Sequence, residues 1–249
     1  MTRRILITGA ASGIGAATAR RLAGPGTALA LHTRARKAPL EAVAEEVRAA
    51  GGAATTLLGD LTEAGTAESL IDDAQRELGG LDALVCNAGF ADATPFSALN
   101  DAVMDRSFQA ITRSFAALAG AARPALEQAR AARIVAVSSF VAHRFQLDGA
   151  HLPASAAAKA GLEALVRALA VELAGQGVTV NAVVPGYVEK DDQAERALDE
   201  AAFQRAVARI PLRRLGRPDD IAAMIAFLLS ADAGYVTGQC LHVNGGLTL

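Results

Sequence analysis

Short apolar runs alternate along this chain with longer segments in which apolar residues recur at the spacing of an α-helix. The runs predict strands at Ile5–Ile7, Ala28–His32, Thr55–Leu58, Ala83–Cys86, Ile134–Val137, Thr179–Val183 and Cys240–Val243. The periodic segments predict helices at Ile14–Leu22, Leu40–Ala50, Ala64–Leu78, about Asn100–Leu126, Ala156–Ala174 and Pro218–Ser230. Such alternation is typical of a parallel sheet with helices on both faces. We therefore predict a doubly wound α/β sandwich with a seven-stranded parallel sheet.

One segment departs from this alternation. Residues Glu189–Arg209 are charged and show no strand pattern. We expect this segment, over about residues 189–210, to form a lid over a functional site. No repeat or linker divides the remainder, so residues 1–249 are expected to form a single domain.

The composition indicates how the core is built. Apolar residues make up 52% of the chain but aromatic residues only 4%, so Ala, Val, Leu and Ile must pack closely. The formal net charge of −2 provides no field that would attract nucleic acid or an anionic membrane. No apolar run reaches the roughly 18 residues of a membrane span. Cys86 and Cys240 lie in apolar contexts without metal-binding spacing, which favours reduced core cysteines, a cytoplasmic protein and no metal site.

A glycine-rich turn follows the first predicted strand and opens the first predicted helix. It reads Thr8-Gly-Ala-Ala-Ser-Gly-Ile-Gly15. Glycines at such a turn let the backbone approach a pyrophosphate closely, and the start of the helix directs N–H groups at its charge. A plain strand-to-helix turn is the alternative interpretation of the glycines alone.

A second motif strengthens the first. The segment Ser155-Ala-Ala-Ala-Lys-Ala-Gly-Leu162, taken with the glycine turn, resembles the short-chain dehydrogenase/reductase family, and within it the 3-oxoacyl-[acyl-carrier-protein] reductases. The segments Ile210–Pro218 and Tyr235–Gly246 resemble the family's C-terminal signature, so the resemblance covers essentially the whole chain. It implies a Rossmann-like fold whose N-terminal half binds a dinucleotide.

The resemblance also implies a set of cofactor contacts. Gly9, Gly13 and Gly15 with Ser12 and Ile14 would hold the pyrophosphate, and Asp60 and Leu61 would contact the adenine. The nicotinamide half would be bordered by Asn87, Ala88, Gly89, Lys159, Pro185, Gly186 and Val188. All but Lys159 follow predicted strands, where such sites form.

The end of the second strand decides between NAD and NADP. An acidic residue there would bind the ribose 2′-hydroxyl, whereas a basic one would hold a 2′-phosphate. The chain reads His32-Thr-Arg-Ala-Arg-Lys37, with no carboxylate, and Arg34 can make charge-assisted hydrogen bonds to phosphate. We predict NADP(H) rather than NAD(H), with a solvated basic turn as the alternative.

The catalytic positions of the family are only partly filled. Ser139 matches the serine that hydrogen-bonds the substrate carbonyl, and Lys159 matches the lysine of the Tyr-x-x-x-Lys motif. Ser155 stands in the tyrosine position, and its hydroxyl has a shorter reach and a much higher pKa than a phenol, so it is a poor acid.

Two further positions depart from the family pattern. Ile111 stands where the family has the asparagine of a proton relay, and Lys190 where a threonine would contact the carboxamide. One engineered substitution would explain Ser155 but not all three departures. The catalytic tetrad is therefore expected to be degenerate.

Other residues are candidates to replace the phenol. His151 or His143 can donate a proton near neutral pH, and Tyr187 carries a phenol of its own. A solvated loop histidine and a pocket-wall tyrosine are the plainer interpretations.

Three hypotheses follow. The first is an NADP(H)-binding oxidoreductase of the ketoreductase kind, slow or with atypical chemistry on a ketone or acyl thioester. The second is a non-catalytic subunit that pairs with an active paralogue. The third is an NADP(H)-binding sensor, or an enzyme that reuses the pocket for other chemistry. By resemblance, a homo-oligomer, either dimer or tetramer, is expected.

Overall fold

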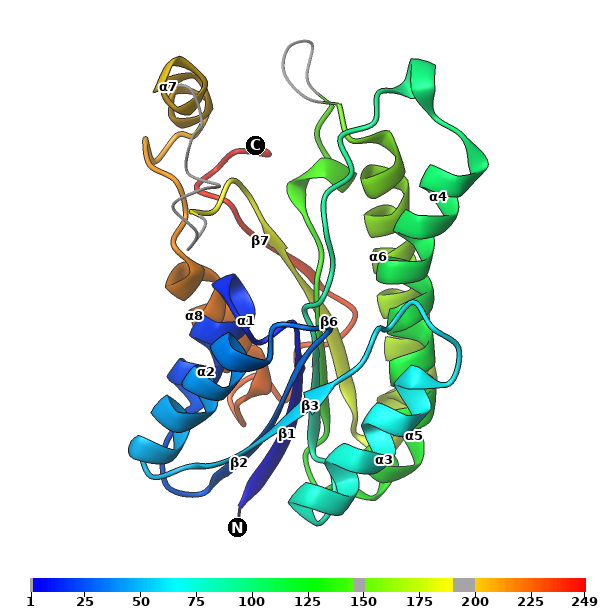
Figure 1. Cartoon of the computed structure of the whole chain (residues 1–249), viewed down its shortest axis with the longest axis vertical. Coiled ribbons are helices and arrows are strands. Elements are labelled where there is room, and N and C mark those ends of the chain that lie inside the picture. Colours follow the sequence, from blue (N-terminus) through cyan, green and yellow to red (C-terminus); the bar gives the residue numbers. More distant parts are fainter. Residues whose placement is uncertain (1, 146–150, 190–199) are drawn as a thin grey trace.

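The computed structural model describes residues 2–145, 151–189 and 200–249 (Figure 1). One sheet runs through the described chain, with strand order β3-β2-β1-β4-β5-β6-β7, and every pairing in it is parallel. The strands are β1 (Arg3–Thr8), β2 (Thr27–Thr33), β3 (Ala53–Leu58), β4 (Ala83–Cys86), β5 (Arg133–Val137), β6 (Thr179–Pro185) and β7 (Cys240–Val243). The predicted doubly wound, seven-stranded Rossmann-like sandwich is confirmed.

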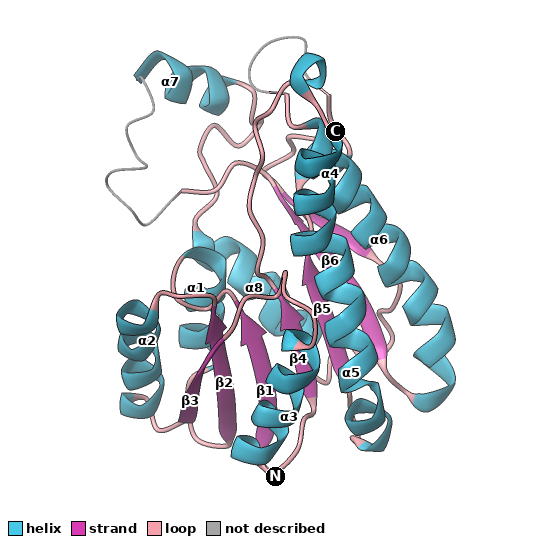
Figure 2. Ribbon diagram, turned by 45° about the vertical axis from the view of Figure 1, so that its right-hand side comes forward, coloured by secondary structure: helices cyan, strands magenta, loops and turns pink. Residues whose placement is uncertain are grey.

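Helices cover both faces of the sheet (Figure 2). The layer on one face contains α1 (Gly13–Leu22), α2 (Lys37–Ala49) and α8 (Pro218–Leu229). The layer on the other face contains α3 (Thr66–Leu78), α4 (Asp101–Phe108), α5 (Ser114–Gln128) and α6 (Pro153–Leu173). The chain changes face between β1 and β4, and parallel sheets of this kind bind ligands at that switch point.

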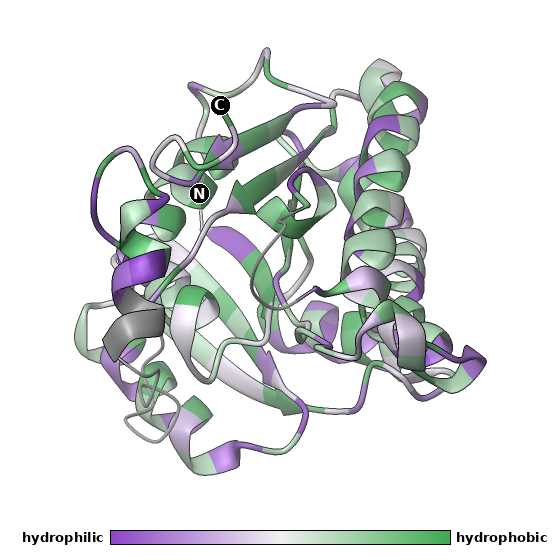
Figure 3. Ribbon diagram, turned by 90° about the horizontal axis from the view of Figure 1, so that it is seen from above, coloured by the Kyte–Doolittle hydropathy of each residue, from purple (hydrophilic) through white to green (hydrophobic). Residues whose placement is uncertain are grey.

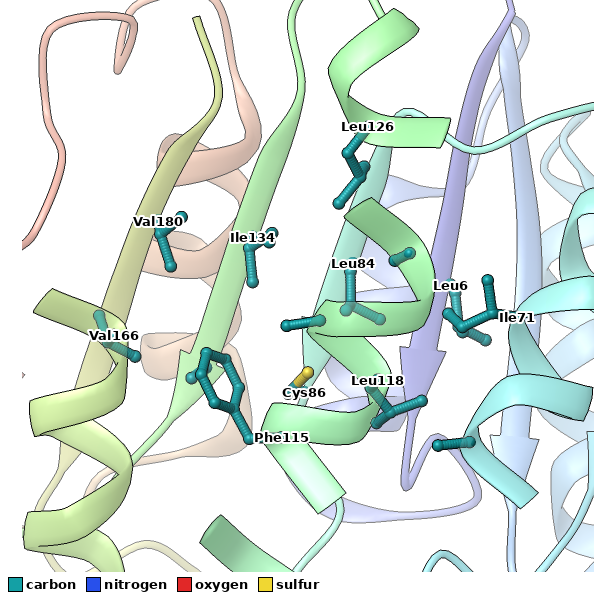
Figure 4. Packing of buried hydrophobic residues seen from close by; sticks show 14 of the residues in the cluster. Leu6, Ile71, Leu84, Cys86, Phe115, Leu118, Leu126, Ile134, Val166 and Val180 are labelled. Carbon is teal, nitrogen blue, oxygen red and sulfur yellow. The ribbon is translucent and has the colours of Figure 1, made fainter. Parts of the chain in front are cut away.

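Each face has its own hydrophobic cluster. Between the sheet and α3, α5 and α6, one cluster contains Phe115 and Leu118 of α5, Leu84 of β4 and Val166 of α6 (Figure 4). Many partners in both clusters are alanines, which lets the helices lie close to the sheet. Figure 3 shows the largely hydrophobic strands lying between the two helical layers. The core is therefore largely aliphatic, as the composition predicted.

Local signals explain where several helices begin. Asn100 caps α4 by accepting a hydrogen bond from the backbone N–H of Val103 at 3.1 Å. Pro153 and Pro218 occupy the first turns of α6 and α8, where a missing N–H costs nothing. Gly79, in the left-handed conformation, ends α3.

The helix predicted from Asn100 to Leu126 is wrong in one respect, because it is not a single α-helix. A π-helical turn, η2 (Gln109–Arg113), separates α4 from α5. It brings Ile111 into the core with 3% exposure. Apolar periodicity alone does not reveal a π-turn, since the residues on either side keep helical spacing.

The charged segment after β6 contains more structure than the prediction gave it. Val188 forms a parallel bridge with Gly216, and helix α7 spans Glu200–Ala208. Residues 190–199 of the lid predicted at about 189–210, Lys190 among them, lie outside the described residues. No helix in the described part of the chain is both long and apolar enough to cross a membrane.

Candidate active site

The sequence-predicted site residues follow six strands and meet at the carboxyl edge of the sheet. Gly9 follows β1, Arg34 follows β2, Asp60 follows β3, Asn87 follows β4, Ser139 follows β5 and Gly186 follows β6. Because all strands are parallel, their carboxyl ends share this edge. Residues up to 177 positions apart are thereby brought to one side of the molecule.

The glycine turn has a geometry that glycine makes possible. Gly9 and Gly13 have φ values of 67° and 54°, in the left-handed region. A Cβ atom on Gly15 would lie 2.3 Å from the Gly9 carbonyl oxygen, so no side chain fits there. At Gly13 a Cβ would meet nothing within 4 Å, which leaves the outer side of the turn open to a ligand.

Asn87 and Thr8 fasten this turn to the end of β4. The Asn87 amide donates to the backbone oxygens of Thr8 and Gly9 at 3.0 and 3.1 Å. The Thr8 hydroxyl oxygen accepts the backbone N–H groups of Asn87 and Ala88 at 3.0 and 3.1 Å. The two parts of the predicted cofactor site therefore form one rigid unit.

Two arginines stand beside the turn. Arg36 donates to the Ser12 hydroxyl at 3.1 Å, and Ser12 is the residue that precedes α1. The Arg34 guanidinium is exposed, with Nη1 3.9 Å from Asp60 Oδ2. Hydrogen bonds from Thr62, and then the charge of Arg34, lower the pKa of Asp60. The donors suit a phosphate group, and the open glycine turn suits the pyrophosphate of a dinucleotide.

His32 supports the turn from below. It is buried, its Nε2 lies 2.9 Å from the Gly59 oxygen, and its backbone oxygen accepts the N–H of Ala10. Burial lowers the pKa of this imidazole. His32 therefore holds the ends of β2 and β3 against the glycine turn.

Lys159 lies under the site. Its Nζ donates to the Val137 oxygen at 2.6 Å, and burial lowers its pKa to about 8. A Cβ on Gly89 would be 3.6 Å from this Nζ. Burial raises the pKa of the neighbouring Cys86 thiol to about 12, so this cysteine stays protonated at neutral pH.

A cavity of about 10 Å³ lies next to Lys159. Its lining includes Thr8, Cys86, Ile111 and Ser114. A cavity of this size is at the lower limit for holding one water molecule. Ile111, in the family's asparagine position, presents an apolar wall to it.

Ser155 is buried and engaged in a structural contact. Its Oγ accepts the backbone N–H of Asp92 at 2.8 Å. The Asp92 carboxylate accepts the N–H of Thr94 at 2.9 Å and pairs with Arg106. Hydrogen bonds from Thr94 and the guanidinium of Arg106 lower the Asp92 pKa to about 2. Ser155 thus anchors the segment that follows β4.

Ser139 caps a short turn. It precedes η3 (Phe140–Ala142), and its Oγ accepts the N–H of Val141 at 3.4 Å. The adjacent Ser138 points elsewhere and donates to Glu163 at 2.6 Å.

The candidate replacements for the phenol lie at different places. His151 is exposed, two residues before α6 begins. The Tyr187 ring packs on Phe140 with centroids 4.7 Å apart. His143 is hydrogen-bonded to Glu163 at 2.8 Å.

The residues around the end of β6 are held by close backbone packing. A Cβ on Gly186 would lie 2.8 Å from Asn244 Cβ, so only glycine allows this approach. Val188 pairs with Gly216, and Leu61 is buried in the core.

Two structural residues were missed from the sequence, Asp92 and Glu163. The spacing Asp92-Ala-Thr94 is a pattern by which aspartate bonds the N–H two residues on, and it could have indicated the turn. Glu163 stands one helical turn after Lys159, on the same face of α6. In the described ranges, no group of three His, Cys, Asp or Glu side chains is arranged to hold a metal ion.

The sheet order, the glycine turn and the lysine on α6 define a doubly wound α/β protein of the Rossmann-like class. The family model described as Enoyl-(Acyl carrier protein) reductase matches residues 9–248. The chain belongs to the short-chain dehydrogenase/reductase family.

Individual relatives match over nearly their full length. The 3-oxoacyl-[acyl-carrier-protein] reductase FabG of Staphylococcus aureus is 34% identical over 247 residues, 99% of this chain and 98% of the relative. Cis-4-hydroxycyclohexanecarboxylate dehydrogenase of Sinomonas cyclohexanicum is 39% identical, with 99% and 96% covered. The crystal structure of a short chain dehydrogenase from Burkholderia cenocepacia in complex with NADP is similar with a TM-score of 0.90. That protein is 31% identical, and the match covers 99% of this chain and 98% of that one.

Proposed function

We propose that the chain is an NADP(H)-binding oxidoreductase of the ketoreductase kind, acting on a ketone or an acyl thioester. It lacks the usual tyrosine acid, so its reaction is slow or uses an atypical proton donor. The proposal rests on one observation, the geometry of the predicted cofactor site. Asn87 and Thr8 hold the glycine turn in place, and Lys159 is buried beside Gly89.

In this proposal, different residues of the chain bind different parts of the cofactor. Gly9, Ser12, Gly13, Ile14 and Gly15 would hold the pyrophosphate, Asp60 and Leu61 the adenine, and Arg34 the 2′-phosphate. Asn87, Ala88, Gly89, Lys159, Pro185, Gly186 and Val188 would border the nicotinamide half. When bound, NADPH would supply the hydride. The names of relatives support this choice, since one structure contains NADP and L-rhamnose 1-dehydrogenase of Azotobacter vinelandii is named for NAD(P)(+).

The proton has several proposed sources. Ser139 would hydrogen-bond the substrate carbonyl and orient it. Ser155, His151 or Tyr187 would then supply the proton, directly or through water. Loss of a general acid typically lowers the rate by ~10²–10⁴, which leaves measurable turnover above solution chemistry. The FabG relatives support an acyl thioester on a carrier protein as one substrate class.

A non-catalytic role is the second candidate, and a specific observation favours it. The Ser155 oxygen already accepts the Asp92 N–H, and Ile111 lies in the hydrophobic core. Such a protein would be a non-catalytic subunit that pairs with an active paralogue, or an NADP(H)-binding sensor in the cytoplasm. In either role we propose a homo-oligomer or a hetero-oligomer rather than a monomer.

Titration with NADPH and NADH tests the proposal. The chain has no tryptophan, so the emission of the nicotinamide can be excited directly and followed. We expect micromolar binding of NADPH, weak binding of NADH, and weaker NADPH binding in R34A. R21A, an exposed arginine in the last turn of α1, is the matched control and should bind like the wild type. If the protein bound neither NADPH nor NADH, both the proposed enzyme and the proposed sensor would be contradicted.

A further inference from the structure

A second polar cluster lies beyond Lys159 on α6, and no part of the proposed chemistry uses it. Its centre is Glu163, which is only 2% exposed. Glu163 Oε1 accepts the Ser138 hydroxyl at 2.6 Å, and His143 Nε2 lies 2.8 Å from the same oxygen. The other carboxylate oxygen lies 3.6 Å from Arg167 Nη2.

A buried carboxylate is stable only when its oxygens have hydrogen-bond partners. Both partners of Oε1 come from the chain that immediately surrounds Ser139. Ser138 precedes it, and His143 ends the η3 turn that Ser139 caps. Glu163 therefore forms hydrogen bonds with both ends of this turn.

The other side of the turn is held by the last part of the chain. The rings of His143 and His242 meet edge to face with centroids 4.5 Å apart. His242 Nδ1 lies 3.0 Å from Thr248 Oγ1, and Arg144 donates to the Leu247 oxygen. The turn that carries Ser139 is thus fixed between α6 on one side and β7 with the segment after it on the other.

We propose that Glu163 is a positioning residue for Ser139, acting through the hydrogen bonds that it accepts from Ser138 and His143. This role rests on the proposed function, in which Ser139 contacts the substrate carbonyl. Glu163 itself touches neither substrate nor cofactor. Its carboxylate also raises the pKa of Lys159, partly offsetting the effect of burial.

A positioning role and a purely structural role have different consequences. If Glu163 only stabilised the fold, its loss would loosen α6 as a whole and weaken cofactor binding along with everything else. If it positions Ser139, its loss should act locally on residues 138–144. The affinity for NADPH, which depends on the glycine turn on the other side of the site, should then be unchanged.

The experiment compares E163L, which removes both acceptors, with E163Q, which keeps an oxygen in the Oε1 position. E172L is the matched control, because Glu172 lies on the same helix and pairs at the surface with Arg123. Hydrogen exchange of residues 138–144, the dissociation constant of NADPH and the KM for ethyl acetoacetate are measured at pH 6.5. This pH is below the Lys159 pKa of about 8 in the wild type. Loss of the Glu163 carboxylate lowers that pKa in E163L and E163Q alike, so a difference between these two variants does not come from the charge of the lysine.

We expect exchange in E163L to be faster by about tenfold or more in residues 138–144, the effect of losing one hydrogen bond to a charged group. KM should rise by a similar factor, with NADPH affinity within about twofold of the wild type. E163Q and E172L should stay close to the wild type in all three. Unchanged exchange in E163L, or equal damage in E163Q and E163L, would overturn the proposal.

Two smaller changes keep the test valid if E163L does not fold. S138A and H143F each remove one donor, and each should speed local exchange. If neither does, the proposal is wrong. A wild-type protein that binds NADPH without turnover would refute the proposed reaction, while the exchange measurements would still decide the role of Glu163.

Discussion

Ser155 and Lys159 stand one turn apart on α6, and burial affects them in different ways. The serine side chain is neutral and has a hydrogen-bond partner, since its oxygen accepts the N–H of Asp92 at 2.8 Å. The lysine is charged, and burial lowers its pKa to about 8. A cation kept in such a position destabilises the fold, which is common where a group serves binding or catalysis.

Restoring the phenol should restore activity if the rest of the site is competent. We expect S155Y to reduce a ketone such as ethyl acetoacetate ~10²-fold faster or more, the usual contribution of a general acid. NADPH oxidation measures the rate. S155F is the control, since it forces the same displacement of the Asp92 segment without a hydroxyl. Equal rates in the two variants would mean that Ile111 and Lys190 also block the reaction.

Removing the Lys159 charge should stabilise the protein at neutral pH. The native state holds this proton less tightly than the unfolded chain, whose lysine has a pKa near 10.5. Stability should therefore rise as the pH increases from about 8 to 10.5 in the wild type, and this rise should be absent in K159M. At pH 7 we expect K159M to be more stable by up to about 3 kcal/mol and to bind NADPH poorly.

Urea unfolding at pH 7 and pH 9.5 provides the measurement. K37M, an exposed lysine at the start of α2, should follow the wild type at both values. If the free energies of unfolding of K159M and the wild type differed by the same amount at both pH values, the idea of a buried charge would be contradicted.

At the scale of elements, the turn between β1 and α1 tolerates little change. Gly9 and Gly15 approach so closely that the turn has one arrangement, and Asn87 bonds across it. The turn is also fixed by packing, because Ala10 and Ala11 contribute their side chains to the hydrophobic core. The binding surface is therefore formed before any ligand arrives.

A methyl group at Gly15 should disrupt that arrangement. We expect G15A to lose NADPH binding and to lower the free energy of unfolding by about 1–3 kcal/mol, the usual effect of overpacking. G120A is the control, because a Cβ there meets nothing within 4 Å in the middle of α5. Chemical denaturation should find G120A equal to or more stable than the wild type, and wild-type stability in G15A would refute the steric argument.

The elements themselves could be predicted from the sequence because their causes are local. Each strand core was found within a few residues, since runs such as Ile5–Ile7 are apolar on both faces. The π-turn at Gln109–Arg113 and the bond from Asp92 to Ser155 were not found. Both depend on contacts between segments far apart in the chain, and a single sequence carries no direct sign of them. The role of Glu163 as a buried hydrogen-bond acceptor could not be predicted for the same reason.

As a single chain, the molecule exposes several large apolar side chains to solvent. Val171 on α6 is 82% exposed, and Tyr235 and Leu249 are fully exposed. Val171 lies in the last turn of α6. Burial of such side chains between copies would account for an otherwise unfavourable surface.

Light scattering after gel filtration tests this association. We expect the purified chain to have the mass of two or four copies of 25.4 kDa, and V171E to shift it towards smaller species. A monomeric wild type would point instead to a hetero-oligomer with a paralogue, and co-purification with that paralogue would then decide.

The strand order also determines when each part of the site can form during synthesis. The strands that carry the glycine turn, β1 to β4, end at Cys86, whereas β7 and the contacts of His242 with the Ser139 turn need the last residues made. The chain is synthesised at roughly 5–20 residues per second. The residues up to Cys86 are therefore made several seconds before those that hold the Ser139 turn. Until β7 arrives, the exposed edge of β6 is the surface that a chaperone would have to protect.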